Sequence, residues 1–114
     1  MGIEAFISPP YHGPAFKGYN AGDLGCLFDY TMIWNVLHYP SGVVPITQVQ
    51  PGEEVYEDSY NDMWTSYIKE DLKGSVGMPM CVQVVSYFGD DEICLGLMKT
   101  IEDKIKFNKL PNIW

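Results

Sequence analysis

Residues 77–106 read GMPMCVQVVSYFGDDEICLGLMKTIEDKIK, and this stretch decides the fold because it joins a strand pattern directly to a helix pattern. Met78 to Ser86 is a nearly continuous apolar run, of the kind found in strands that are covered on both faces. The Asp-Asp-Glu sequence at 90–92 places negative charge where the start of a helix favours it. Apolar residues then recur at helical spacing, which predicts a helix that ends at about Lys106.

Two further strand patterns and two further helix patterns lie upstream. Short apolar or β-branched runs at Ile3 to Ser8 and at Val43 to Val49 predict strands. Pro45 inside the second run indicates either a position near a sheet edge or a strand that begins only after the proline. Helical patterns cover 24–37 and 61–73. The order strand, helix, strand, helix, strand, helix predicts an α/β fold with a largely parallel or mixed sheet flanked by helices.

The helix expected at Leu24 to Leu37 has an unusual composition. Asp23 is its predicted N-cap, and Pro40 is its stop. Asp29 and Asn35 are its only strongly polar residues, so apolar side chains cover every side. A helix that is apolar all round is a buried helix, and 114 residues offer too little protein to surround it. We therefore expect that further polypeptide, outside these residues, covers this helix.

The charge of the chain argues against one class of partner. Seven lysines and no arginine oppose fifteen acidic residues, which gives a net charge of −8. Without a guanidinium group, recognition of nucleic acid is not expected.

Membrane and compartment signals are equally sparse. No apolar stretch approaches the ~20 residues of a transmembrane helix, and the first thirteen residues lack the basic region of a secretory signal. Three widely spaced cysteines, Cys26, Cys81 and Cys94, lie in apolar runs and indicate buried free thiols in a reducing compartment, with the cytosol as the default.

No pattern of residue types in the sequence indicates a complete active site. A thiol hydrolase would need one of the three cysteines to meet His12 or His38, but desolvation in apolar runs raises a thiol pKa, so inert thiols are the favoured interpretation. No ligand spacing for zinc is present, and the acidic residues at 53–58 lack the pattern of a calcium loop. The glycine-rich segment at 18–25 is a weak match to a phosphate-binding loop. No metal and no cofactor is expected.

One resemblance covers nearly the whole chain. The segments are DYTMIWNVLHYPSGVVPITQV at 29–49, NDMW at 61–64, KGSVGMPMCVQVVSYFGDDEICLGLMKTIED at 73–103 and the opening IEAFISPPYHGPAF at 3–16. In this order they resemble the C-terminal part of the amidase signature family, above all its fatty acid amide hydrolase branch, where corresponding segments read FPAGVVPVT, SVGLPVAVQ and EELCLRFM. The segment after Val49 is a few residues shorter here.

The resemblance implies a serine amidase that cleaves carbon–nitrogen amide bonds of fatty acyl amides, without a cofactor. Its nucleophilic Ser, its second Ser in a cis peptide and its Lys base come from a part of the family that precedes these segments. This chain has no Ser-Ser and no Gly-Gly, so we expect the isolated chain to be inactive. Residues 1–114 are then a C-terminal segment of an amidase domain and incomplete as a folding unit.

The resemblance also implies where such an enzyme works. The expected location is intracellular, either cytoplasmic or peripheral to an internal membrane, with membrane contact made only by segments outside this chain. The parent enzyme could be a homo-oligomer.

Four residues are candidates for substrate binding by the same resemblance. Gly25, Phe28 and Met32 match positions that line the acyl channel, and their spacing places them on one helix face. Trp64 matches a channel aromatic on the later helix. The alternatives are that these side chains are ordinary core, or that the chain is a non-catalytic paralogue that binds a lipid or a longer amidase chain.

Overall fold

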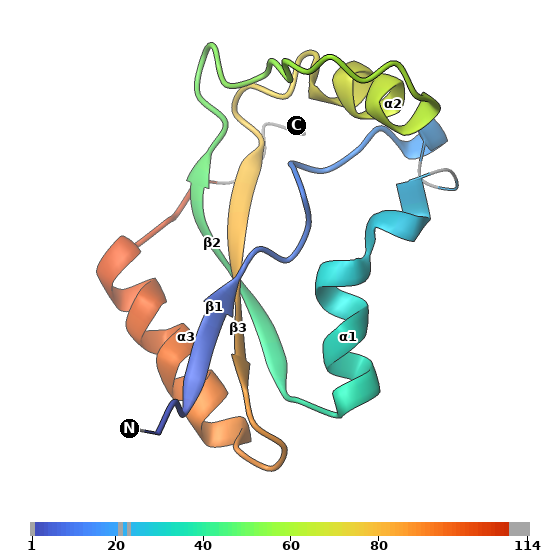
Figure 1. The fold of residues 1–114 in the computed structure, drawn as a ribbon. Coiled ribbons are helices and arrows are strands. Elements are labelled where there is room, and N and C mark those ends of the chain that lie inside the picture. Colours follow the sequence, from blue (N-terminus) through green and yellow to red (C-terminus); the bar gives the residue numbers. More distant parts are fainter. Residues whose placement is uncertain (1, 21, 23, 110–114) are drawn as a thin grey trace.

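The computed structural model describes residues 2–20, 22 and 24–109, and it contains a three-stranded sheet between two helices, with a third helix beyond one end (Figure 1). The strands are β1 (Ala5–Ser8), β2 (Ser41–Gln48) and β3 (Pro79–Ser86). The α-helices are α1 (Asp29–Leu37), α2 (Met63–Leu72) and α3 (Asp91–Ile105). Two short 3-10 helices, η1 (Gly18–Asn20) and η2 (Leu24–Leu27), precede α1.

The α/β class and the order of strands and helices agree with the prediction, but the strand directions differ from it. The sheet has the order β1-β3-β2, and β3 pairs antiparallel with both neighbours. β1 and β2 therefore run parallel to each other, with β3 between them. The parallel pairing expected from the alternating pattern is not found among the described strands, because the two parallel strands are not adjacent.

The connection between β2 and β3 explains this difference. Val49 donates its N–H to the carbonyl of Met78 at 3.0 Å, and Gly77 donates to the carbonyl of Val49 at 2.9 Å. These bonds extend the strand pairing and close a hairpin around residues 50–76. α2 lies within this long insertion, beyond the end of the sheet, and does not cross a sheet face as a parallel connection would require (Figure 1).

The two faces of β3 are covered by different helices (Figure 1). On one face, α3 packs on the strands and the Sγ of Cys94 lies 3.6 Å from the carbonyl oxygen of Val84. On the other face, Gln83 is 1% exposed and its Nε2 donates to the backbone carbonyl of Tyr30 in α1 at 3.0 Å. Successive residues of a strand point to opposite faces, so the Gln83–Val84 pair joins both layers.

Of the two alternatives for the proline-containing strand, the edge position is confirmed, because β2 contains Pro45 and does not begin after it. β2 is an outer strand of the sheet, and its register with β3 shifts between Pro45 and Thr47. Proline lacks the N–H that an inner strand would need, and a bulge beside it bends the strand.

α1 is shorter than predicted. The expected helix over 24–37 is divided into η2 and α1, with Phe28 between them at the N-cap position of α1 and no side-chain cap. The predicted N-cap, Asp23, lies outside the described residues. The C-terminus agrees with the prediction, because His38 adopts a left-handed conformation (φ 55°) and Tyr39 donates back to the carbonyl of Trp34.

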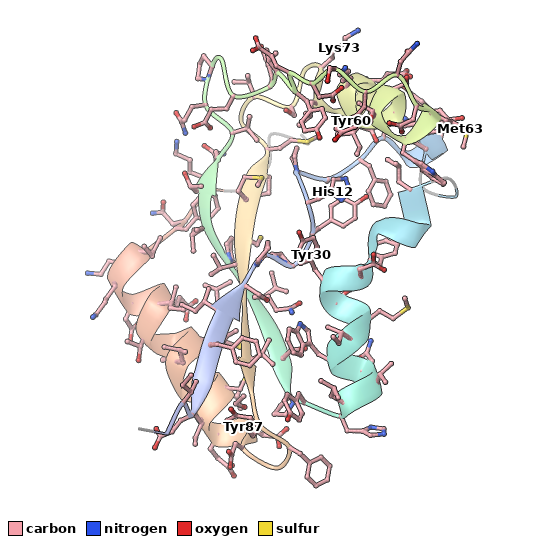
Figure 2. All side chains as sticks on the ribbon, in the orientation of Figure 1. His12, Tyr30, Tyr60, Met63, Lys73 and Tyr87 are labelled. Atoms are coloured by element: carbon pink, nitrogen blue, oxygen red, sulfur yellow. The ribbon has the colours of Figure 1, made fainter. Side chains whose placement is uncertain are left out.

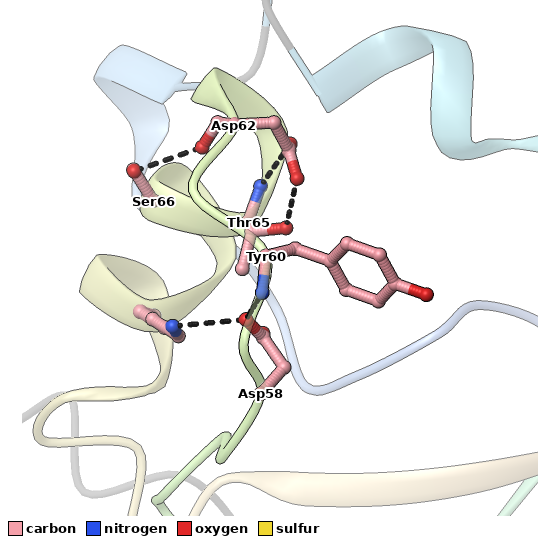
Figure 3. A network of polar contacts seen from close by, with 6 residues as sticks. Asp58, Tyr60, Asp62, Thr65 and Ser66 are labelled. Carbon is pink, nitrogen blue, oxygen red and sulfur yellow. Dashed lines mark hydrogen bonds and ion pairs between the residues drawn. The ribbon is translucent and has the colours of Figure 1, made fainter.

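The start of α2 is fixed by one capping residue (Figure 3). Asp62 accepts hydrogen bonds from the N–H of Thr65 at 2.9 Å and from its hydroxyl at 2.6 Å. Ser66 donates its hydroxyl to the backbone carbonyl of Asp62 at 2.9 Å. The first four N–H groups of a helix have no partner within it, and Asp62 accepts one of them. This cap sets α2 to begin at Met63, two residues later than the apolar pattern alone predicted.

Candidate functional site

A hollow lies where the loop after β1 meets α1 and α2. It is a cavity of about 330 Å³, and Figure 2 shows His12 in the space between α2 and the start of α1. Its wall is mostly aromatic and aliphatic, and it also carries the imidazole of His12 and the carboxyl groups of Asp29 and Asp71. The charge of Asp71 acts on the imidazole of His12. The lining residues are Tyr11, His12, Gly13, Pro14, Phe16, Leu24, Asp29, Tyr30, Tyr56, Ile68, Asp71 and Leu72.

Aromatic rings build one side of this cavity. The ring centroids of Tyr11 and His12 are 3.9 Å apart, and those of Tyr11 and Phe16 are 5.6 Å apart. Phe28 contacts both Tyr11 (5.5 Å) and Phe16 (6.2 Å) in tilted or edge-on arrangements. These are the separations that aromatic pairs prefer, so the loop is held against the start of α1 by ring packing.

Asp71 holds the opposite side together. Its Oδ1 accepts the backbone N–H of Lys17 at 3.1 Å and the Nδ2 of Asn20 at 2.9 Å. Its neighbour Glu70 receives two further bonds, from Lys17 Nζ to the backbone carbonyl at 2.8 Å and from the Tyr19 hydroxyl to Oε1 at 2.9 Å. The end of α2 thereby fixes the segment 17–20, which is more than fifty residues away in sequence.

The electrostatics of the cavity favour a neutral imidazole. Partial burial lowers the pKa of His12, and the negative charge of Asp71 opposes this shift without reversing it. A neutral His12 can both accept and donate a hydrogen bond. The cavity wall therefore offers a ligand an apolar surface with a few polar groups, which is the usual composition of a small-molecule site.

The thiol hydrolase considered above gains no support from the geometry. Cys94 is buried and Cys81 is half-buried, and burial raises the pKa of both thiols. His38 lies at the exposed end of α1, and His12 packs on Tyr11. The side chain of Cys26 lies outside the part that the structure describes.

The four predicted channel residues flank the cavity without lining it. Gly25 and Phe28 are adjacent, because an ideal Cβ on Gly25 would lie 3.9 Å from Cε2 of Phe28. Met32 follows one turn later and donates its N–H to the carbonyl of Phe28 at 2.9 Å. Trp64 lies on α2, one turn before the cavity residue Ile68. Phe28, Met32 and Trp64 are 40%, 54% and 38% exposed.

The sequence did not reveal the cavity itself. Tyr11 and Phe16 lie in a loop without periodicity, and the residue type of His12 suggests only a catalytic group. Asp71 lies in a helix where acidic residues alternate with basic ones, so no local signal separates it from solvent-exposed charges. Its contacts with residues 17–20 arise only from the fold.

Two further features concern metals and membranes. Within 2–20, 22 and 24–109, no group of three or more His, Cys, Asp and Glu side chains is arranged to hold a metal ion. None of the helices in these same ranges has both the length and the hydropathy to cross a bilayer.

Comparison with known proteins gives a consistent group of relatives. The chain is 33% identical to fatty-acid amide hydrolase 1 of Sus scrofa over 110 residues, which are 93% of this chain and 19% of the relative. It is 37% identical to fatty acid amide hydrolase 1 of Caenorhabditis elegans over 76 residues, which are 64% of this chain and 13% of that protein. A protein of Schizosaccharomyces pombe named as an amidase is 29% identical over 107 residues, 88% of this chain and 19% of its own length.

No family model matches the chain. The chain spans less than a fifth of the length of each of these curated relatives.

Proposed function

We propose that this chain, which belongs to the amidase signature family and is similar to its fatty acid amide hydrolases, acts as one part of a larger amidase. In that enzyme, α1 and the start of α2 form a wall of the channel that holds the acyl chain of a fatty acyl amide. The catalytic Ser, Ser and Lys come from polypeptide outside these 114 residues.

The observation that carries this proposal is the exposure of α1. The helix has no fully buried residue, although most of its side chains are apolar. Met32, Ile33 and Val36 are 54%, 49% and 74% exposed, and Leu37 is 45% exposed. Trp34 buries its Nε1–H with no hydrogen-bond partner among the described residues. Apolar surface of this extent on one helix is typical of a contact surface, and a larger amidase would supply what covers it.

The channel role of Gly25, Phe28 and Met32 is supported by their placement. They occupy one side of the η2–α1 segment, and Phe28 and Met32 are open to solvent. A wall of a channel needs such an exposed apolar row, because the substrate covers it only when bound.

The test is a chimera in which the matched 110 residues of the Sus scrofa enzyme are replaced by this chain. With a fluorogenic fatty acyl amide, we expect turnover by the chimera and none by the 114-residue chain alone. Met32→Glu in the chimera should raise KM by about tenfold or more, because a carboxylate in an apolar channel is costly to desolvate.

Val76→Glu is the control, because Val76 is 42% exposed and lies in the loop before β3, outside the apolar surface of α1. It should change KM little when the folded fraction, measured by thermal unfolding, is the same. Equal KM values for the two variants would refute the channel role. If the isolated chain turned over the substrate and a serine-directed fluorophosphonate abolished that turnover, the proposal that the catalytic residues lie outside these 114 residues would be refuted.

A second function is favoured by the cavity of about 330 Å³, which is large enough for a small ligand. The chain would then be a non-catalytic paralogue that binds a lipid amide. A ligand at a hundred times its Kd should stabilise the fold by about 2.7 kcal/mol. A long-chain amide that raises the melting temperature of the wild type but not that of Phe16→Asp would favour this function, and an unchanged melting temperature for both would exclude it.

A further inference from the structure

Two buried carboxyl groups lie at α2, and only one of them has a positively charged partner. The side chain of Asp58 is 9% exposed, and the ammonium group of Lys69 lies 3.2 Å from its Oδ1 (Figure 3). Asp71 is also 9% exposed, but no ammonium group of the described residues lies within ion-pairing distance of it. A buried carboxylate is costly unless its charge and its hydrogen bonds are matched, so Asp71 needs an explanation that Asp58 does not.

One oxygen of Asp71 is matched and the other is free. Oδ1 accepts the backbone N–H of Lys17 and the Nδ2 of Asn20. Oδ2 is buried and has no hydrogen-bond partner among the described residues. The ammonium group of Lys17 is directed elsewhere, since it donates to the backbone carbonyl of Glu70 at 2.8 Å. His12 does not balance the charge either, because partial burial lowers the pKa of its imidazole below the ordinary value of 6.5 and leaves it neutral at neutral pH.

The rest of the cavity of about 330 Å³ suits a small cation. Four aromatic rings line it: Tyr11 and Phe16 from the loop after β1, Tyr30 from the first turn of α1 and Tyr56 from the segment before α2. The face of an aromatic ring attracts an ammonium group that lies within about 6 Å of its centroid. None of the described lining residues is a lysine, and the other charged group in the wall is a second carboxyl, Asp29.

We propose that this cavity binds a small alkylammonium ion, which donates an N–H to the free Oδ2 of Asp71 and places its alkyl groups against the four aromatic rings. Asp71 supplies the opposite charge, and the rings supply cation–π attraction and an apolar surface. A cavity of this volume is at the lower end of the range for small-molecule sites, so the ligand is small. The inference goes beyond the proposed function, because it gives the cavity a cationic ligand in place of a lipid amide and does not require the acyl channel.

The test compares n-butylammonium with n-butanol, its uncharged counterpart. Each probe is titrated into the 114-residue chain at neutral pH, and binding is followed by calorimetry. We expect n-butylammonium to bind about tenfold more tightly or better, because only the ammonium ion makes a charge-assisted hydrogen bond with Asp71. Equal affinities would overturn the proposal, since a purely apolar cavity does not distinguish the two probes.

A third probe tests the hydrogen bond. Butyltrimethylammonium carries the same charge but has no N–H to donate to the Oδ2 of Asp71. It should bind more weakly than n-butylammonium. Equal or tighter binding would refute the assignment of an ammonium ion that carries an N–H.

Two asparagine variants locate the ammonium group. Asp71→Asn removes the charge but keeps an oxygen that can accept from Lys17 and Asn20, and it should weaken n-butylammonium binding by about tenfold or more. Asp58→Asn is the matched control, because Asp58 is similarly buried, also has an Oδ2 without a partner among the described residues, and is not among the residues that line the cavity. It should leave the affinity unchanged. Equal loss in both variants would refute the role of Asp71.

Phe16→Leu tests the aromatic wall and leaves Asp71 with its hydrogen bonds. Leucine keeps an apolar side chain but has no ring, so the affinity for n-butylammonium should fall by about threefold while that for n-butanol stays unchanged. An equal fall for both probes would show that Phe16 supplies only apolar surface and would refute the cation–π contribution. This variant stays informative if thermal unfolding shows that Asp71→Asn does not fold.

The chimera described above repeats the titrations with the polypeptide of a larger amidase around the chain, and it decides the question if the isolated chain is unfolded. An active chimera that leaves n-butylammonium unbound would refute this site alone. A folded but inactive chimera that binds n-butylammonium would refute the proposed function and leave the ammonium site standing.

Discussion

Gln83 joins the sheet to α1 with a single side chain. It is 1% exposed, and its Nε2 lies 3.0 Å from the carbonyl oxygen of Tyr30 and 3.4 Å from the hydroxyl oxygen of Ser8. A buried amide remains inside a protein only when it is hydrogen-bonded. Gln83 lies in the strand whose apolar run predicted that both faces are covered, and this prediction is confirmed. Its hydrogen bond to Tyr30 joins residues that are 53 positions apart in sequence, and a strand pattern cannot predict such a long-range contact.

Gln83→Leu should therefore loosen α1. We expect the free energy of unfolding to fall by about 1–2 kcal/mol, because the hydrogen bond is lost while the volume is nearly conserved. Chemical denaturation would measure the loss. Ser8→Ala serves as the control, since its 3.4 Å contact is long, and it should cost less. An equal cost for both variants would contradict the assigned role of Gln83.

Asp62 makes the start of α2 sensitive to pH. The hydroxyl of Thr65, and then its backbone N–H, lower the pKa of Asp62 below its ordinary value of 3.8 by bonding to the charged form. A carboxyl with a lowered pKa stabilises the fold fully above its ordinary pKa, and the contribution is lost as pH falls through the lowered pKa. The stability difference between the wild type and Asp62→Ala should thus stay constant above about pH 5 and shrink below it. A difference that grows in acid would contradict the cap.

At the scale of elements, α3 and β2 meet closely at one glycine. An ideal Cβ on Gly42 would overlap the Sδ and Cε atoms of Met98. Gly42→Ala should destabilise the chain by about 1 kcal/mol or less, because the overlapping atoms are the end of a flexible side chain that has to turn away. In a Met98→Ala background, the same substitution should cost clearly less, and thermal unfolding of the four proteins of this cycle would measure the coupling. Additive costs would show that the side chain of Met98 moves aside freely.

The elements differ in how far the sequence predicted them. α3 and β3 lie within one or two residues of their predicted ends, because acidic residues and an apolar run mark them clearly. The edge position of β2 was one of the two alternatives that Pro45 indicated. The division of 24–37 into η2 and α1 was missed, because an apolar pattern does not distinguish 3-10 turns from an α-helix. Strand direction was also missed, since the insertion at 50–76 resembles a crossover in sequence and forms a hairpin in space.

At the scale of the whole molecule, the exposed apolar surface has a measurable consequence. We expect the isolated chain to bind an apolar fluorescent dye strongly, and Val36→Glu, at a position of α1 that is 74% exposed, to reduce that binding. Val76→Glu is the control, because Val76 is 42% exposed and lies outside α1. Equal dye binding by both variants would mean that α1 is not the exposed surface.

The sheet order also constrains when the fold can form. β1 ends at Ser8, but its partner β3 begins at Pro79, and β2 also pairs with β3. During synthesis on a ribosome, β1 and β2 therefore have no partner among the three described strands until β3 has left the exit tunnel. Contacts this distant in sequence make folding slow, and the two waiting strands remain open to aggregation throughout that delay. The order of folding events thus depends on β3, which is the last of the three described strands to be synthesised.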